Sequence, residues 1–165
     1  MRFIGSALVA SAFVLGACGG GEQKPAADST AAAPVAAADA TPAAAGTAAP
    51  ITGTTHEVKM LGDEKGYRFE PANITVKAGD GIKFTFVTGG PHNVAFDPAQ
   101  FTDAAVKAQL DANFVGEKMA ELSSKMMMTA GESVTISFGG IKPGEYHFNC
   151  TPHLAMGMKG VVTVQ

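Results

Sequence analysis

Hydrophobic and polar residues alternate in short runs along the last two-thirds of the chain. In the run 82–86, Ile82, Phe84 and Phe86 alternate with Lys83 and Thr85. This alternation is typical of a strand with one buried face. Six other short runs resemble strands: 56–60, 74–76, 92–96, 134–138, 145–150 and 160–164.

Turn-forming residues separate these runs, as in "AGDG" at 78–81, "TGGP" at 88–91 and "GGIKPGE" at 139–145. Glycine, proline and aspartate supply the backbone conformations that tight turns need. The pattern predicts an all-β fold, a Greek-key sandwich or barrel of seven to eight strands.

One segment departs from the alternation. Val106, Leu110 and Phe114 recur at every fourth position after Thr102 or Asp103, either of which could cap a helix. The sequence therefore predicts one short helical insertion, whose main role is to cover an end of the sandwich.

The parity of the run 145–150 predicts which side chains point inward. Successive side chains of a strand point to opposite faces, so Tyr146, Phe148 and Cys150 share the apolar face. His147 then points outward. We interpret His147 and His56 as surface histidines.

The N-terminal segment "MRFIGSALVASAFVLGACGG" has a basic residue, a short apolar run and then small residues, the arrangement of a secretory signal. The apolar run, 3–17, is shorter than the ~20 residues that a membrane-spanning helix needs, so an uncleaved anchor is the weaker interpretation. "LGAC" at 15–18 resembles a bacterial lipobox, which implies cleavage before Cys18 and lipidation of that residue. Gly19 after the cysteine favours the outer membrane if the envelope is Gram-negative.

Residues 19–55 are mostly Ala, Pro, Thr and Gly, and prolines interrupt any helix at short intervals. We expect a disordered tether with a mean span on the order of 35 Å. The sequence thus predicts three parts: a signal peptide with lipobox at 1–18, the tether at 19–55, and one folded domain at 56–165. The mature protein would be exported, periplasmic or at the cell surface, and anchored to a membrane by lipid.

The composition excludes several function classes. The net charge is −3, and no basic stripe marks a nucleic-acid site. We find no phosphate-binding loop and no Ser/His/Asp arrangement, so the chain is not expected to be an enzyme.

The chain contains two cysteines, and lipidation of Cys18 would leave Cys150 without a disulfide partner. A bound metal would protect a free thiol in an oxidising compartment. "CTPHLAMGM" at 150–158 places Cys150 and His153 on one short loop with Met158. Two imidazoles, one thiolate and a weak axial thioether are the copper ligands of electron-transfer sites. His92 in "GGPHNVAF" is the candidate second imidazole.

These residues resemble the blue copper proteins, the cupredoxins. "CTPHLAMGM" is similar to the ligand loop of pseudoazurin, and its spacing is also that of plastocyanin. "YRFEPANITVKAGDGIKFTF" followed by "PHNV" is similar to the plastocyanin pattern before the first histidine ligand. The resemblance implies one copper ion held by His92, Cys150, His153 and Met158. Met156 is the rival axial ligand, as in the shorter loop of amicyanin.

The resemblance also implies a function: single-electron transfer between transient protein partners by a monomer that cycles between Cu(I) and Cu(II). The edge of His153 would be the electron port, surrounded by an apolar docking surface that includes Leu154 and Met156. Asn93 would connect the two ligand loops. Asn149 departs from the family pattern because plastocyanins of plants have an aromatic residue there, so photosynthetic partners are not implied.

One alternative remains open, and a second is disfavoured. A copper carrier or storage module would bind Cu(I) through thioethers, and "KMMMT" at 125–129 contains Met126, Met127 and Met128. Alternation would let the first and last of these pair without the middle one. A multicopper enzyme would need a second domain or more than the four histidines of this chain.

Overall fold

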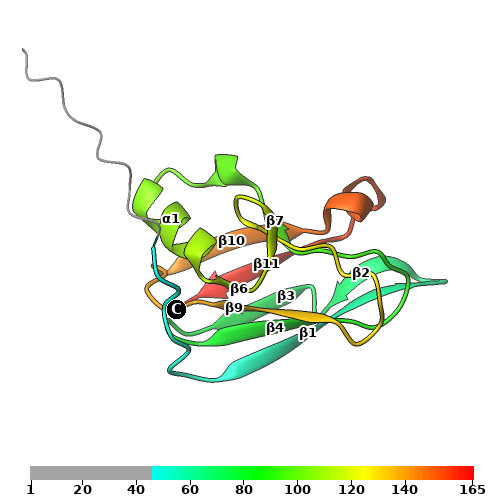
Figure 1. Cartoon of the computed structure of the whole chain (residues 1–165), viewed down its shortest axis with the longest axis horizontal. Coiled ribbons are helices and arrows are strands. Elements are labelled where there is room, and N and C mark those ends of the chain that lie inside the picture. Colours follow the sequence, from blue (N-terminus) through cyan, green and yellow to red (C-terminus); the bar gives the residue numbers. More distant parts are fainter. Residues whose placement is uncertain (1–45) are drawn as a thin grey trace, which may run out of the picture. The chain divides into compact units, whose positions relative to one another are not determined.

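The computed structural model describes residues 46–165, which form a two-layered β-sandwich (Figure 1). One sheet has five strands in the order β2-β1-β4-β9-β6, and the other has six in the order β3-β11-β10-β5-β8-β7. The all-β sandwich with one short helix is confirmed. The strands are β1 (Thr55–Asp63), β2 (Gly66–Glu70), β3 (Asn73–Val76), β4 (Gly81–Phe86), β5 (Ala95–Phe96), β6 (Phe114–Val115), β7 (Lys118–Ala120), β8 (Ser123–Ser124), β9 (Ser133–Ser137), β10 (Gly144–Asn149) and β11 (Lys159–Val164).

The core lies between the inward faces of the sheets. Phe84 on β4 and Phe148 on β10 meet with ring centroids 5.3 Å apart, and Phe69 on β2 approaches Phe148 to 4.7 Å. Edge-on aromatic contacts of this kind stabilise beyond the area that they bury. The predicted parity of β10 is confirmed, because Tyr146, Phe148 and Cys150 are buried while His147 is exposed.

The seven predicted runs correspond to β1, β3, β4, β5, β9, β10 and β11. The structure adds β2 and three strands of two or three residues, β6, β7 and β8. These short strands pair at one edge of each sheet, and runs of that length carry no detectable alternation.

The helical insertion is α1 (Ala104–Ala112), preceded by the short 3₁₀ helix η1 (Pro98–Gln100). Of the two predicted caps, Asp103 is the one used: its side chain accepts hydrogen bonds from the backbone N–H groups of Ala105 and Val106. Val106 and Leu110 are buried. Phe114 was expected on the same helix but lies in β6, because the helix ends at Ala112 and is capped by Asn113.

Residues 46–54, which the sequence assigns to the tether, pack on the domain. The backbone N–H of Ala49 donates to the buried Asn113 side chain (2.8 Å), and that of Thr54 donates to Asp80 (2.8 Å). The folded part therefore begins before residue 56. His56, expected to be a solvated surface residue, is instead half-buried, with its Nε2 2.9 Å from Asp80 Oδ2.

The predicted signal peptide, Cys18 and most of the predicted tether lie outside the described residues. Among residues 46–165, no helix has the length and apolar character needed to cross a bilayer.

Candidate metal centre

The loop after β10 brings Cys150 and His153 together. Cys150 precedes the 3₁₀ helix η2 (Thr151–Met156), in which the carbonyl of Cys150 accepts from the backbone N–H of His153 (3.1 Å). Gly157 then takes the left-handed conformation (φ 83°), which glycine adopts without steric cost. The chain then turns back toward β11, and the carbonyl of Met158, the residue before that strand, accepts from the N–H of Cys150 (3.1 Å). Backbone hydrogen bonds thus fix the loop at both ends.

His92 approaches from the loop between β4 and β5. It pairs with Met127 as an isolated antiparallel bridge, with hydrogen bonds of 3.0 and 2.7 Å between their backbones. This bridge holds the His92 backbone against the segment 125–129. The side chain can then reach the loop that carries the cysteine, although 58 residues separate the two in sequence.

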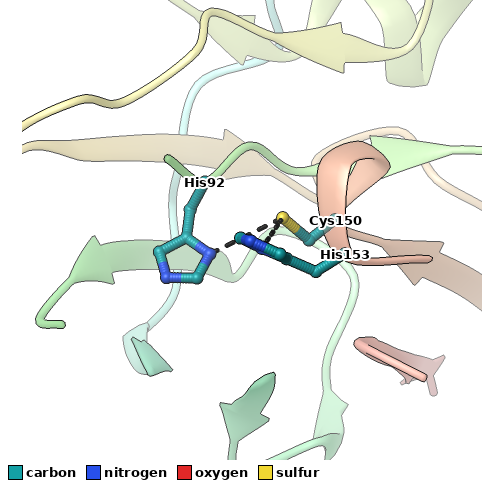
Figure 2. Close-up of side chains that lie close together, drawn as sticks. All are labelled: His92, Cys150 and His153. Atoms are coloured by element: carbon teal, nitrogen blue, oxygen red, sulfur yellow. Dashed lines mark hydrogen bonds between the residues drawn. The ribbon is translucent and has the colours of Figure 1, made fainter. Parts of the chain in front are cut away.

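The three side chains converge (Figure 2). Cys150 Sγ lies 3.6 Å from His92 Nδ1 and 3.4 Å from His153 Nδ1. All three donor atoms lie within 4.8 Å of one another. Cys150 and His92 are fully buried, and His153 is 5 % exposed. The structure therefore assembles one sulfur and two imidazole nitrogens in a buried site, in which only His153 retains slight exposure.

The tautomer of His92 follows from its other nitrogen. Nε2 lies 2.9 Å from the carbonyl oxygen of Thr88, which can only accept, so Nε2 carries the proton. Nδ1 therefore presents its lone pair toward the sulfur. Metal-binding histidines commonly have this arrangement, in which a second partner fixes ring orientation and tautomer.

Burial determines the protonation of the site. Desolvation raises the pKa of the Cys150 thiol, while the backbone N–H groups of Asn93 and His153 act in the opposite direction. Desolvation also lowers the pKa of His92 and of His153. Both imidazoles are thus neutral and able to ligate at neutral pH. A cation would be needed to stabilise the buried thiolate.

The two candidate axial methionines differ sharply in exposure. Met158 is fully buried, whereas Met156 is 61 % exposed. Leu154 is also exposed, so Leu154 and Met156 form an apolar surface on η2.

Asn93 connects the loops around the site. Its Oδ1 accepts from the N–H of Thr151 (2.7 Å), and its Nδ2 donates to Thr151 Oγ1 (3.0 Å) and Ser123 Oγ (3.1 Å). Asn93 is fully buried, and these bonds link the His92 loop to the residue directly after Cys150.

Two residues of the site were missed by the sequence analysis. Tyr67 stacks on the His153 ring, and Thr88 supplies the carbonyl that orients His92. The alternation of Tyr67 and Phe69 in "GYRFE" could have revealed strand β2. No pattern in the sequence would have placed the Tyr67 ring against a histidine from the far end of the chain.

The donor set fits copper. A soft thiolate with two imidazoles favours copper over the hard cations Mg²⁺ and Ca²⁺, and structural zinc sites usually have four Cys or His ligands. The fold and the site together define a copper-binding β-sandwich.

Comparisons with known proteins also indicate a copper-binding protein. Residues 56–165 match the family described as copper binding proteins, plastocyanin/azurin family. A plastocyanin of Nostoc punctiforme is 41 % identical over 113 residues, covering 67 % of this chain and 74 % of that protein. A plastocyanin of Prochlorothrix hollandica is 34 % identical over 119 residues, covering 72 % and 79 %. The solved structure of oxidized plastocyanin from Dryopteris crassirhizoma is 34 % identical, with a TM-score of 0.53, and covers 66 % of this chain and 99 % of its own.

The chain therefore belongs to the plastocyanin/azurin family of copper-binding proteins. Membership implies a copper cofactor and copper-based electron transfer.

Proposed function

We propose that this chain is a membrane-tethered type 1 copper protein that carries single electrons between protein partners in the cell envelope. The observation that carries the proposal is the convergence of Cys150 Sγ with the Nδ1 atoms of His92 and His153 in a buried site. Copper, when bound, would supply a one-electron Cu(I)/Cu(II) couple.

The proposed ligands are His92, Cys150, His153 and Met158. Met158 is preferred to Met156 because its side chain is fully buried and its carbonyl accepts a hydrogen bond from the backbone N–H of Cys150. With four ligands from the chain, no position would remain for a substrate, unlike a catalytic metal site that keeps one open. The site therefore favours electron transfer over catalysis.

The protein's own contribution is rigidity. The β10–η2–β11 turn is closed by backbone hydrogen bonds, His92 is held by Met127 and Thr88, and Asn93 links the two loops. Ligands that are fixed before the electron arrives need little rearrangement, which favours fast transfer. Burial keeps water away from the sulfur and the imidazoles.

Partners would dock at the η2 end. Leu154 is 48 % exposed and Met156 61 %, and they flank the nearly buried His153. A small apolar surface of this kind suits brief encounters that bury little area. The partner itself would be a protein with its own redox centre, and we expect the chain to act as a monomer.

Electrochemistry of the full chain, purified in detergent and loaded with Cu(II), tests electron carriage. We expect one copper per chain and a reversible wave that fits a one-electron couple. Copper that is bound but cannot be reduced and reoxidised reversibly would contradict the proposal.

The anchor would be a lipid on Cys18, and the part of the predicted tether 19–55 that precedes residue 46 would connect the membrane to the folded part. Growth with a clickable fatty acid should label the wild-type protein. The Cys18→Ser variant should remain unlabelled and leave the membrane fraction. Equal labelling of both proteins would refute lipidation at Cys18.

A copper carrier is the second candidate, because two methionines near the site are strongly exposed: Met128 is 68 % exposed and Met156 61 %. Met127 is fully buried, so the three consecutive methionines do not share one face. Anaerobic titration with Cu(I) separates the candidates. Saturation at one equivalent favours the electron carrier, whereas further equivalents lost in a Met126→Leu/Met128→Leu variant favour carriage.

A further inference from the structure

The β1–β2 hairpin contacts both histidines of the metal centre, although none of the proposed ligands lies on it. We propose that Tyr67 on this hairpin is a positioning residue that fixes the ring of His153, and that the same hairpin fixes His92 through Thr88. The inference rests on the ligand set proposed above.

The first contact is an aromatic stack. The rings of Tyr67 and His153 are nearly parallel, with an interplanar angle of 13° and centroids 3.7 Å apart. The tyrosine ring also meets His92 edge-on at 6.2 Å. His153 Nδ1 points at the sulfur, 3.4 Å away, while Tyr67 covers a face of the ring. The imidazole therefore cannot rotate about its side-chain bonds without leaving the stack.

Gly62 makes this position of the tyrosine ring possible. Gly62 on β1 pairs directly with Tyr67 on β2. A Cβ atom at Gly62 would lie 2.6 and 2.8 Å from two carbons of the tyrosine ring, closer than real Cβ contacts allow. It would also lie 2.9 Å from the Cα of Gly89. The ring can thus cross its neighbouring strand only where that strand has no side chain.

The second contact uses the same glycine. The N–H of Gly62 donates to the carbonyl of Thr88 (2.8 Å), and His92 Nε2 donates to that same carbonyl (2.9 Å). One carbonyl oxygen therefore joins the hairpin to the second imidazole. Because a metal-binding histidine depends on the partner of its other nitrogen, the hairpin also determines the orientation of His92.

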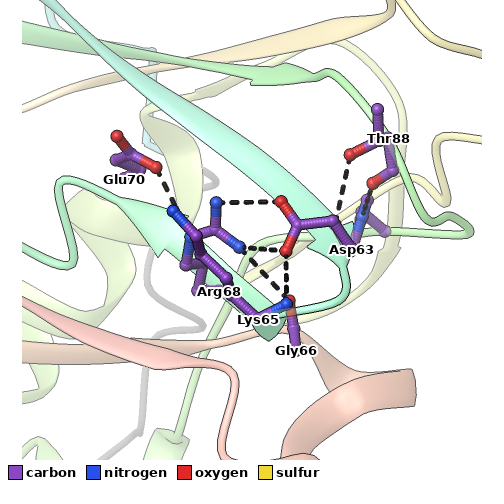
Figure 3. A network of polar contacts seen from close by, with 8 residues as sticks. Asp63, Lys65, Gly66, Arg68, Glu70 and Thr88 are labelled. Carbon is purple, nitrogen blue, oxygen red and sulfur yellow. Dashed lines mark hydrogen bonds and ion pairs between the residues drawn. The ribbon is translucent and has the colours of Figure 1, made fainter.

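Polar contacts at the tip fix the hairpin's own shape (Figure 3). Asp63 accepts two hydrogen bonds from the Arg68 guanidinium (2.7 and 3.0 Å) and one from the N–H of Lys65 (2.9 Å). Glu70 lies 3.4 Å from the same guanidinium. This bidentate pairing holds the register that places Tyr67 opposite Gly62.

Two variants of the full chain, Tyr67→Leu and Tyr67→Phe, test the proposal. Leucine removes the stack and phenylalanine keeps it. In the copper-free protein, the proton NMR signals of the His153 ring should be displaced by the ring current of the tyrosine. The displacement should vanish in the leucine variant and persist in the phenylalanine variant.

Competition titration with Cu(II) gives the second readout. We expect the leucine variant to bind copper roughly tenfold more weakly, the effect of losing a residue that supports a ligand, and the phenylalanine variant to stay within about twofold of wild type. Phe101→Leu is the matched control, because it removes a partly buried ring that stacks on Tyr146 and lies two residues before Asp103, the cap of α1. It should leave the copper affinity unchanged.

The outcomes separate this inference from the proposed function. If wild type binds copper and the leucine variant matches it in both affinity and histidine signals, the role of Tyr67 is refuted while the metal site stands. If the Tyr67→Phe variant binds copper as weakly as the Tyr67→Leu variant, the stack is refuted as the cause of the loss of affinity. If wild type binds no copper, the proposed function fails, and the NMR signals of the copper-free protein still report whether the stack exists.

Discussion

The two ends of the sandwich both bury polar side chains but pair them differently. At the metal end, the Nδ1 atoms of His92 and His153 contact the Cys150 sulfur, at 3.6 and 3.4 Å. At the end that holds residues 46–54, Asn113 and Asp80 make short hydrogen bonds to backbone groups. Nδ1 of His92 can only accept, and a thiol is a weak hydrogen-bond donor. The metal-end histidines therefore have weak hydrogen bonds as long as no ion is bound, whereas Asn113 and Asp80 have strong ones.

The strands show that these two ends are far apart. Asp80 directly precedes β4, and His92 follows its other end. At about 3.3 Å per residue, the six residues of β4 separate the two regions by roughly 20 Å. Stability and metal binding should accordingly respond to different mutations.

The largest effect on stability is expected at Asn113. Its Nδ2 donates to the carbonyls of Ser137 and Gly139 (both 2.9 Å), and its Oδ1 accepts from the N–H of Ala49. Asn113→Ala would leave these buried groups without partners and lower the free energy of unfolding by about 3 kcal/mol. Urea unfolding of the copper-free protein measures it.

The control for this prediction is Asn73→Ala, since Asn73 is exposed on β3 and its loss should cost under about 0.5 kcal/mol. The copper spectrum of the Asn113 variant should match wild type. A changed spectrum would show that the two ends are coupled.

Asn93→Ala should weaken copper binding, in contrast to the Asn113 variant, which should affect stability. It breaks the bonds to Thr151 that join the ligand loops, and we expect copper affinity to fall by about 10- to 100-fold. Competition titration measures the affinity. An affinity equal to that of wild type would show that Asn93 is a turn residue without a role in copper binding.

Met158→Leu sharpens the assignment of the axial ligand. Leucine replaces the buried methionine with little change in volume, so the copper-free protein should lose under about 1.5 kcal/mol of stability. The optical spectrum and the reduction potential should nevertheless change, because the thioether is gone. Met156→Leu is the matched control and should leave both unchanged; the reverse result would make Met156 the axial ligand.

The smallest effect concerns pH at the end opposite the metal. Backbone N–H groups of Lys77 and Thr54, together with His56, lower the pKa of Asp80 from 3.8 to about 2. The folded state thus binds this proton less tightly than the unfolded chain does. Its contribution to stability is present above pH 4 and is lost as the pH falls toward 2. Acid unfolding of the copper-free protein should show a shallower loss in Asp80→Asn; equal slopes would contradict the prediction.

The sequence predicted the regular part of the molecule because alternation is a local property. The alternation of Ile82, Phe84 and Phe86 predicts β4 whatever strands lie beside it. The spacing of Cys150 and His153 likewise predicts that they share a loop. Placing His92 beside them required chemical knowledge of copper sites as well as pattern.

The missed features depend on pairings between distant segments. Tyr67 reaches His153 only because β2 pairs with β1 in the register that sets Gly62 opposite the ring. Residues 46–54 lack any core pattern, and backbone hydrogen bonds to Asn113 and Asp80 hold them. Hydrophobicity does not reveal which buried side chain a distant backbone N–H will meet.

The central claim is that the Cys150 thiolate and two imidazoles bind one redox-active copper ion. Optical and EPR spectra of the full chain with Cu(II), for wild type and Cys150→Ser, test it most directly. We predict an intense visible band and a narrow copper hyperfine pattern in wild type, both lost in the variant while the fold persists. Wild-type protein that takes up copper without this band, or a variant that keeps it, would contradict the account.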